Sequence, residues 1–164
     1  MPRPMKDDSD VEGWFRFRLG RRDQIVLFKA KGESPSHIRL KAAAYALFFR
    51  DLENLQLNPR VDYKVQPDLA AINLEGEPEI WIQCVNGRDV DDVEYICKHS
   101  PAREVVLVAE DMDTKELINR LKKRVHYRYL SDKLRVINFT QPVEEWLDPE
   151  NLDVPSGTYD VIEF

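Results

Sequence analysis

The segment between residues 115 and 135 carries the side chains best suited to binding a charged ligand. It holds eight Lys and Arg against two acidic residues, a net charge of +6. Its second half includes the run His126-Tyr127-Arg128-Tyr129. Basic side chains contact phosphates, and tyrosine rings stack on nucleic-acid bases. The candidate nucleic-acid-binding residues are therefore Lys122, Lys123, Arg124 and Arg128. The alternative is a solvated helix face whose tyrosines cover the core.

The charge of the whole chain points the other way. Its 164 residues have a formal net charge of −6, which argues weakly against constitutive nucleic-acid binding. Residues 140–164 carry seven Asp and Glu and no Lys or Arg. This asymmetry predicts either a basic binding face or an internal pairing of the acidic tail with the basic segment. In the second case the chain is a protein-interaction module whose tail masks its basic face.

Other chemistry has little support in the sequence. The three histidines lie far apart, and Cys84 and Cys97 lack the spacing of a metal site. Gly-rich phosphate loops and the HExxH and GxSxG motifs are missing, which leaves nucleotide binding and serine-based hydrolysis unsupported. The two cysteines sit in apolar segments and are interpreted as buried thiols. Without an apolar leader or a long apolar run, we expect a cytoplasmic protein that does not enter a membrane.

The apolar periodicity predicts the elements that position these residues. Two alternating runs, 14–19 and 24–29, indicate a hairpin, and helical spacing follows at 37–52. Further strands are expected at 61–66, 79–85, 104–109 and 134–139, with helices at 89–98 and 113–125. The order β-β-α-β-β-α-β-α-β predicts an α/β fold, a mixed β-sheet flanked by helices.

The same reading divides the chain into three parts. Residues 1–12 are polar and contain proline, and we expect a flexible N-terminus. Residues 13–140 form one domain, a size that can bury a core without disulfides. Residues 141–164 form the acidic C-terminal tail, with a short helix near 144–147 and a possible edge strand at 158–164.

A pair of short motifs in the middle of the chain is similar to a known family. Gln66-Pro67-Asp68-Leu69 is followed by a turn through Gly76 and then by Glu79-Ile80-Trp81-Ile82-Gln83-Cys84. This pair resembles the YaeQ family, whose fold is the restriction-endonuclease-like PD-(D/E)XK type. The preceding helix, with Lys41 and Tyr45-Ala46-Leu47, resembles the first helix of that family. The resemblance covers about residues 14–140.

The resemblance implies a particular nuclease site. Nucleases of this superfamily place an Asp on one strand and an Asp/Glu-x-Lys motif on its neighbour, and the carboxylates share a Mg²⁺ that activates water. Asp68 matches the Asp, Gln83 falls on the second carboxylate, and Val85 falls on the lysine. The implied ligands of Mg²⁺ or Mn²⁺ are thus Asp68 and Gln83, and a cofactor is expected only if the site is active.

Two of the three positions depart from the pattern. Gln83 offers an oxygen without charge, and Val85 offers neither charge nor a hydrogen bond. The chain is therefore predicted to be a degenerate member that binds nucleic acid or a protein without catalysis. The alternative is a Mg²⁺- or Mn²⁺-dependent nuclease with a relocated site, in which Lys41 or His37 replaces the missing cation. Asp68 can also be a turn residue that follows proline.

Overall fold

The computed structural model describes residues 12–85 and 90–164, and its chain begins with a hairpin. Strands β1 (Gly13–Leu19) and β2 (Asp23–Lys29) pair antiparallel, as the alternating pattern predicted. Their inward side chains, among them Phe17 and Leu27, are buried at 2% exposure each. The hairpin therefore presents one apolar face to the rest of the molecule.

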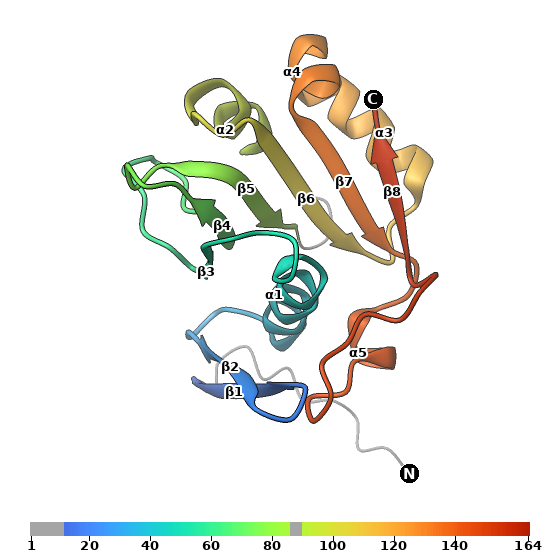
Figure 1. Ribbon diagram of the computed structural model, residues 1–164. Coiled ribbons are helices and arrows are strands. Elements are labelled where there is room, and N and C mark those ends of the chain that lie inside the picture. The colour runs from blue at the N-terminus through green and yellow to red at the C-terminus, as the bar shows by residue number, and fades with distance from the viewer. Residues whose placement is uncertain (1–11, 86–89) are drawn as a thin grey trace.

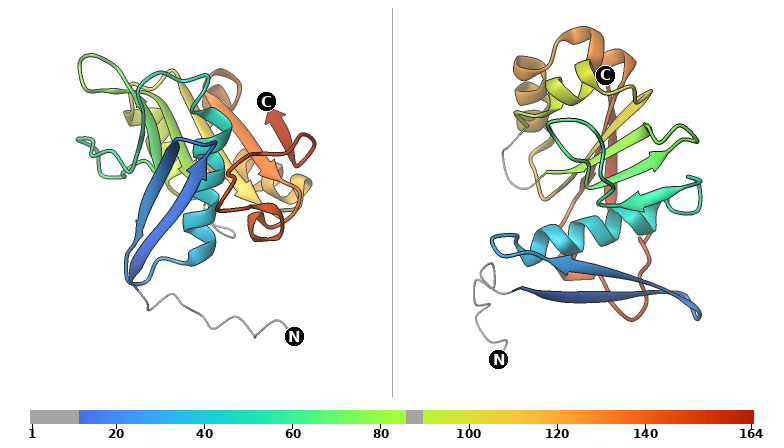
Figure 2. Two further views of the ribbon diagram at one scale, coloured as in Figure 1. Left: turned by 60° about the horizontal axis from the view of Figure 1, so that its bottom comes forward. Right: turned by 90° about the vertical axis from the view of Figure 1, so that its left-hand side faces the viewer.

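Helix α1 (Pro35–Phe48) lies against that apolar face. Ser34 caps its N-terminus by accepting a hydrogen bond from the backbone N–H of His37, at 3.1 Å. Ile38 packs toward the hairpin, whereas Leu40 and Ala44 pack toward the main sheet. A helix that is apolar on opposite sides is buried between two layers, and Figure 2 shows α1 between the hairpin and the sheet.

The main sheet has six strands in the order β3-β4-β5-β6-β7-β8. Their bounds are β3 (Leu55–Leu57), β4 (Leu69–Ile72), β5 (Pro78–Cys84), β6 (Glu104–Glu110), β7 (Leu134–Phe139) and β8 (Tyr159–Glu163). The central strands β5, β6 and β7 run parallel, and the outer pairings are antiparallel. The expected mixed α/β fold is confirmed.

The helices α2 (Val93–His99), α3 (Thr114–Arg124) and α4 (Tyr127–Asp132) cover the face of the sheet opposite to α1. Trp81 and Leu117 are fully buried between these helices and the sheet. The short α5 (Val143–Trp146) contacts α1 on the other face. The molecule is thus layered as hairpin, α1, sheet and helices (Figures 1 and 2). No helix in the described part of the chain is long and apolar enough to cross a membrane.

The strand predicted at 61–66 is wrong. This segment is a loop that the Gln66 side chain holds together. The amide of Gln66 donates to the carbonyls of Val61 and Tyr63, and its oxygen accepts from the backbone N–H of Val61, each at 2.8 Å. A side chain that satisfies backbone groups locally removes the need for a strand partner. The strand beside β5 is β4, immediately after Asp68.

The basic helix α3 ends where the apolar spacing predicted, and the short helix α4, which was not predicted, follows it. The chain leaves the helical conformation at Val125, and His126 begins α4 by accepting from the backbone N–H of Arg128 at 3.3 Å. Beyond residue 140 the chain adds β8 to the edge of the sheet, as its alternation predicted. The prediction for residues 1–11 lies outside the described residues, as does residue 89, where the helix at 89–98 was expected to begin, and α2 itself begins at Val93.

Candidate functional site

Asp68 lies immediately before β4, and its carboxylate links β4 to β5 and to α1. Its Oδ2 accepts a hydrogen bond from the backbone N–H of Cys84 at 2.7 Å, which extends the β4–β5 pairing by one bond. Its Oδ1 lies 3.1 Å from Nε2 of His37 and 3.5 Å from Nζ of Lys41, both on α1. His37 and Lys41 are four residues apart, so they share one face of the helix. The carboxylate is 11% exposed, so these contacts replace most of its hydration.

Lys41 makes further contacts around Asp68. Its side chain is 6% exposed, and its ammonium donates to Oδ1 of Asn58 at 2.9 Å and to Oε2 of Glu33 at 3.2 Å. With Asp68 these acceptors use all three of its protons. Asn58 has a backbone φ of 48°, a conformation that asparagine tolerates better than most residues. We call Glu33, His37, Lys41, Asn58 and Asp68 the Asp68 cluster.

Gln83 and Val85, the other positions of the implied nuclease motif, do not join the Asp68 cluster. The side-chain oxygen of Gln83 accepts from the indole N–H of Trp81 at 2.9 Å. Val85 is buried in the apolar core between α2 and the sheet. Within the described ranges, neither side chain has a hydrogen bond or ion pair to Asp68 or Lys41. The structure therefore brings Asp68 and Lys41 together and leaves Gln83 engaged elsewhere.

In this arrangement groups of the protein compete with a divalent cation for the oxygens of Asp68 and Gln83. Mg²⁺ and Mn²⁺ require carboxylate or carbonyl oxygens with free lone pairs. Both oxygens of Asp68 already accept from the protein, the Lys41 ammonium lies at the carboxylate, and the Gln83 oxygen is occupied. Residues 12–85 and 90–164 hold no group of three or more His, Cys, Asp and Glu side chains placed to bind a metal.

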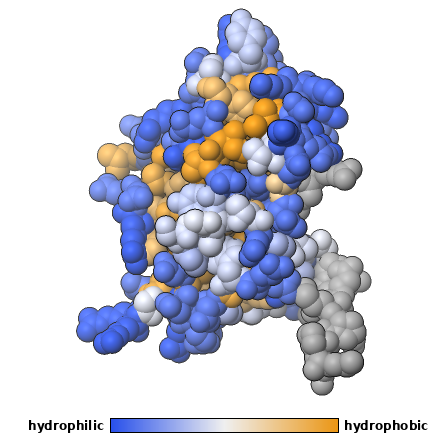
Figure 3. Space-filling view, turned by 90° about the vertical axis from the view of Figure 1, so that its right-hand side faces the viewer, coloured by the Kyte–Doolittle hydropathy of each residue, from blue (hydrophilic) through white to orange (hydrophobic). Residues whose placement is uncertain are grey.

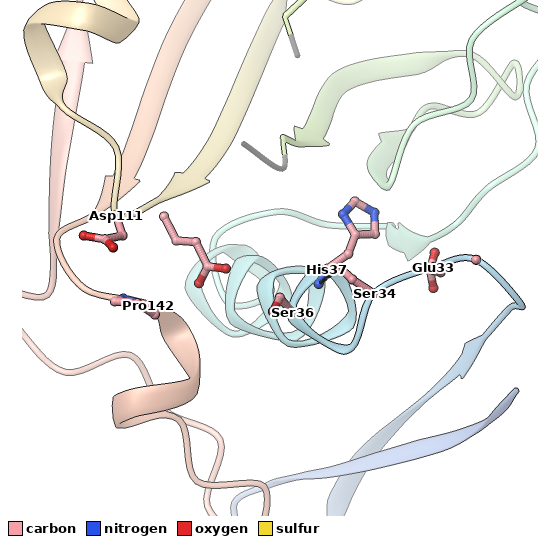
Figure 4. Close-up of a pocket in the computed structure, with 8 residues that line it drawn as sticks. Glu33, Ser34, Ser36, His37, Asp111 and Pro142 are labelled. Carbon is pink, nitrogen blue, oxygen red and sulfur yellow. Dashed lines mark hydrogen bonds between the residues drawn. The ribbon is translucent and has the colours of Figure 1, made fainter. Parts of the chain in front are cut away.

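A cleft of about 860 Å³ opens beside the start of α1. Figure 4 shows Glu33, Ser34 and His37 on the side of α1, with Asp111 and Pro142 on the loops that follow β6 and β7. Oε1 of Glu33 and Nδ1 of His37 are buried and have no hydrogen-bond partner among the described residues. These two atoms are the unsatisfied part of the Asp68 cluster.

Glu110, which lies at the end of β6, also lines this cleft. Its Oε2 accepts from the backbone N–H of Val143 at 2.6 Å and so caps the start of α5. Burial raises the pKa of this carboxyl group, and the nearby Asp111 and Glu144 raise it further. The hydrogen bond from Val143 and the charge of Arg39 lower the pKa and partly oppose that shift.

The predicted nucleic-acid-binding residues lie on the opposite face of the sheet, on α3 and α4. All four are exposed. Arg124 forms an ion pair with Asp91 at 3.1 Å. The other three are Lys122, Lys123 and Arg128. Their side chains have no ion pair or hydrogen bond with any described residue, and we call these residues the free cations. The acidic segment forms no ion pair with these three side chains, and its Glu144 and Glu150 pair with Arg39 and Arg18 instead.

Both cysteines are buried, as expected. Burial raises the pKa of the Cys84 thiol well above its usual value, and Asp68 adds to the shift. Burial raises the pKa of Cys97 to about 11. A nucleophilic thiol needs the opposite shift, so neither cysteine is a catalytic candidate.

The sequence singled out Asp68, Lys41 and His37, but it did not point to Glu33 or Asn58. Both of these come from loops whose path depends on the packing of α1 against β3 and β4. Glu33 lies four residues before His37, yet it precedes the helix cap, so helical spacing alone does not assign it. A pattern within one helix therefore finds two members of the Asp68 cluster and misses the two that lie in loops.

The fold matches two solved structures at low sequence identity. No protein-family model matches the chain, and no curated protein does. The YaeQ protein from Xanthomonas axonopodis pv. citri aligns with a TM-score of 0.63 at 18% identity, over 93% of this chain and 92% of that one. The YaeQ protein from Pseudomonas syringae gives 0.63 at 15% identity, over 93% and 89%. The chain is therefore an α/β protein with the fold of these YaeQ proteins, as the sequence resemblance predicted.

Proposed function

We propose that this chain is a YaeQ-like, non-catalytic nucleic-acid-binding module with a degenerate nuclease site of the PD-(D/E)XK type. The exposure of the free cations carries the binding part of the proposal. Three positive charges within seven residues, none neutralised by a described neighbour, form a surface for phosphates. The contacts of Asp68 with Lys41, His37 and Cys84 support the non-catalytic part, because they compete with a metal ion for this carboxylate.

Fluorescence anisotropy with labelled oligonucleotides tests the binding surface. The variant replaces Lys122, Lys123 and Arg128 by Gln, and the matched control replaces Arg16, Arg21 and Arg22, exposed on the hairpin, by Gln. Each phosphate contact contributes about 0.7 to 0.9 to the slope of log affinity against log salt. The free-cation variant should therefore lose affinity between 50 and 200 mM salt and flatten this slope by about 2.

The control variant should keep the affinity and slope of the wild type. Equal losses in the two variants would show that binding follows net charge and not this surface. Lack of binding by the wild-type protein in low salt would reject the proposal, because phosphate contacts are strongest there.

A second candidate, a Mg²⁺- or Mn²⁺-dependent phosphodiesterase with a relocated site, is favoured by one observation. Glu33 and Lys41 bring a carboxylate and an ammonium to Asp68, and Oε1 of Glu33 lacks a partner. In this function Lys41, whose Nζ lies 3.5 Å from Oδ1 of Asp68, replaces the missing cation of the motif. Amide NMR spectra recorded during a Mn²⁺ titration separate the candidates, with Asp68→Ala as the control. Broadening localised near Asp68 and lost in the variant would support the phosphodiesterase, and its absence supports the non-catalytic module.

A further inference from the structure

An apolar groove lies beside the free cations, between α3, α4 and β8. It has a volume of about 430 Å³. Its walls are formed by Ile118, Lys122, Tyr127, Leu130, Ser131, Ile162, Glu163 and Phe164. Figure 3, which views the molecule from the side of β8, shows an apolar band bordered by hydrophilic surface. Lys122, one of the free cations, belongs to the wall of this groove, so charge and apolar surface are continuous.

Tyr127 is the most exposed of the large apolar and aromatic side chains in the groove. It leaves 76% of its surface open to solvent, although it is a large aromatic residue at the first position of α4. Its ring lies 4.4 Å from that of His126, at an angle of 32°, so one neighbour supports it. Tyr129, two residues later, is instead half-buried against the core. The helix therefore uses one tyrosine for packing and leaves the other available to a ligand.

We propose that this groove binds an unpaired base of a single-stranded nucleic acid. The base stacks on Tyr127, and the phosphates on either side contact the free cations. The inference rests on the proposed function and narrows it to a substrate class. Aromatic stacking combined with basic side chains is how proteins hold single strands without reading their sequence.

The chemistry of the groove favours a single strand over a duplex. In a duplex the faces of the bases are covered by their neighbours, so Tyr127 has no ring to stack on. Glu163 lies on the wall contributed by β8. Its carboxylate repels phosphates, and it accepts hydrogen bonds from the amino groups of bases. The backbone of the ligand therefore lies on the side of α3, where Lys122 and Lys123 are, and the base points into the groove.

Binding of a labelled 12-nucleotide single strand and of the matching duplex, measured by fluorescence anisotropy in low salt, tests this inference. The variants are Tyr127→Ala, which removes the ring, and Tyr127→Phe, which removes only the hydroxyl group. The matched control is Trp14→Ala on the hairpin, where another aromatic side chain is 72% exposed. We expect the single strand to bind about tenfold more tightly than the duplex. Tyr127→Ala should lose about tenfold for the single strand, and Tyr127→Phe and Trp14→Ala should lose little.

Each other outcome has a distinct meaning. Equal affinity for the single strand and the duplex, with no effect of Tyr127→Ala, would overturn the inference. If the free-cation variant still loses binding in that case, the proposed function stands. Light scattering tests for a wild-type dimer that the Tyr127→Ala variant does not form. Such a dimer would assign the groove to a second copy of the chain and would overturn the inference. Lack of binding to either oligonucleotide would reject both proposals.

Discussion

The two faces of the sheet use charged residues in opposite ways. On the α1 side, Asp68 and Lys41 are buried and satisfy one another together with Glu33, His37 and Asn58. On the α3 and α4 side, the free cations are exposed and contact no described acidic residue. A charge that is fully paired inside the protein contributes to the native structure, and a charge that is left in solvent remains available to a ligand.

The buried contacts of Asp68 give this residue a structural role. Asp68 follows proline, and its carboxylate extends the β4–β5 pairing and contacts His37 and Lys41 on α1. A residue that holds three elements together is retained for stability even when it binds no metal. The surface that we propose to bind nucleic acid lies on the other side of the sheet, away from Asp68.

The largest effect is expected from Asp68→Ala. This change leaves the buried ammonium of Lys41 without one of its acceptors and removes the carboxylate from His37 and Cys84. Breaking a buried ion pair costs about 3 to 5 kcal/mol, and urea denaturation measures the loss. The matched control is Asp62→Ala, an exposed aspartate in the loop before β4, which should stay within about 0.5 kcal/mol of the wild type. Similar small losses of unfolding free energy for both variants would show that the Asp68 cluster does not stabilise the fold.

A smaller, pH-dependent effect is expected from Glu110→Gln. Because the pKa of Glu110 is raised in the folded protein, the native state holds its proton where the unfolded chain has released it. Stability from this group therefore falls as the pH rises from the unfolded pKa through the folded pKa. The Gln variant escapes this loss, so its stability relative to the wild type should increase between pH 4 and pH 7 in denaturation curves. An unchanged difference over that range would contradict the raised pKa.

The smallest effect on stability is expected from substitution of the free cations. Replacing Lys122, Lys123 and Arg128 by Gln removes three charges that no described residue neutralises. Exposed substitutions away from packing and caps usually change the free energy of unfolding by less than about 0.5 kcal/mol. Thermal unfolding of this variant should match that of the wild type. A loss of several kcal/mol would show that these cations serve the fold, and the contrast between the faces would fail.

Much of the fold was predictable because its elements have clear periodicity. The hairpin alternates buried and exposed residues, and β6 is an apolar run buried on both faces, so each carries its own signal. The predicted strand at 61–66 failed because apolar alternation does not reveal that the Gln66 side chain satisfies the backbone there. Helix α4 was not predicted, because His126 caps it through its ring nitrogen, a role seldom marked in a sequence.

The candidate sites were predictable to different extents. Lys41 and His37 share a helix face, so the sequence could place both near one neighbour. Which neighbour they meet depends on how α1 packs on the sheet, and the contacts of Lys41 with Glu33 and Asn58 follow from that packing. The free cations were predictable as charges, but the ion pair of Arg124 with Asp91 requires the structure of two separate elements.

The backbone bonds between the hairpin and the C-terminal segment have a consequence for how the chain folds. The N–H of Arg18 donates to the carbonyl of Pro149 at 2.7 Å, and the N–H of Leu152 donates to the carbonyl of Arg18 at 2.7 Å. These residues lie near opposite ends of the chain, so the loop they close is long. During synthesis the hairpin leaves the ribosome long before residues 149–152 do. The hairpin can therefore pair with residues 149–152 only after these residues have been synthesised. This contact is expected to be among the last to form.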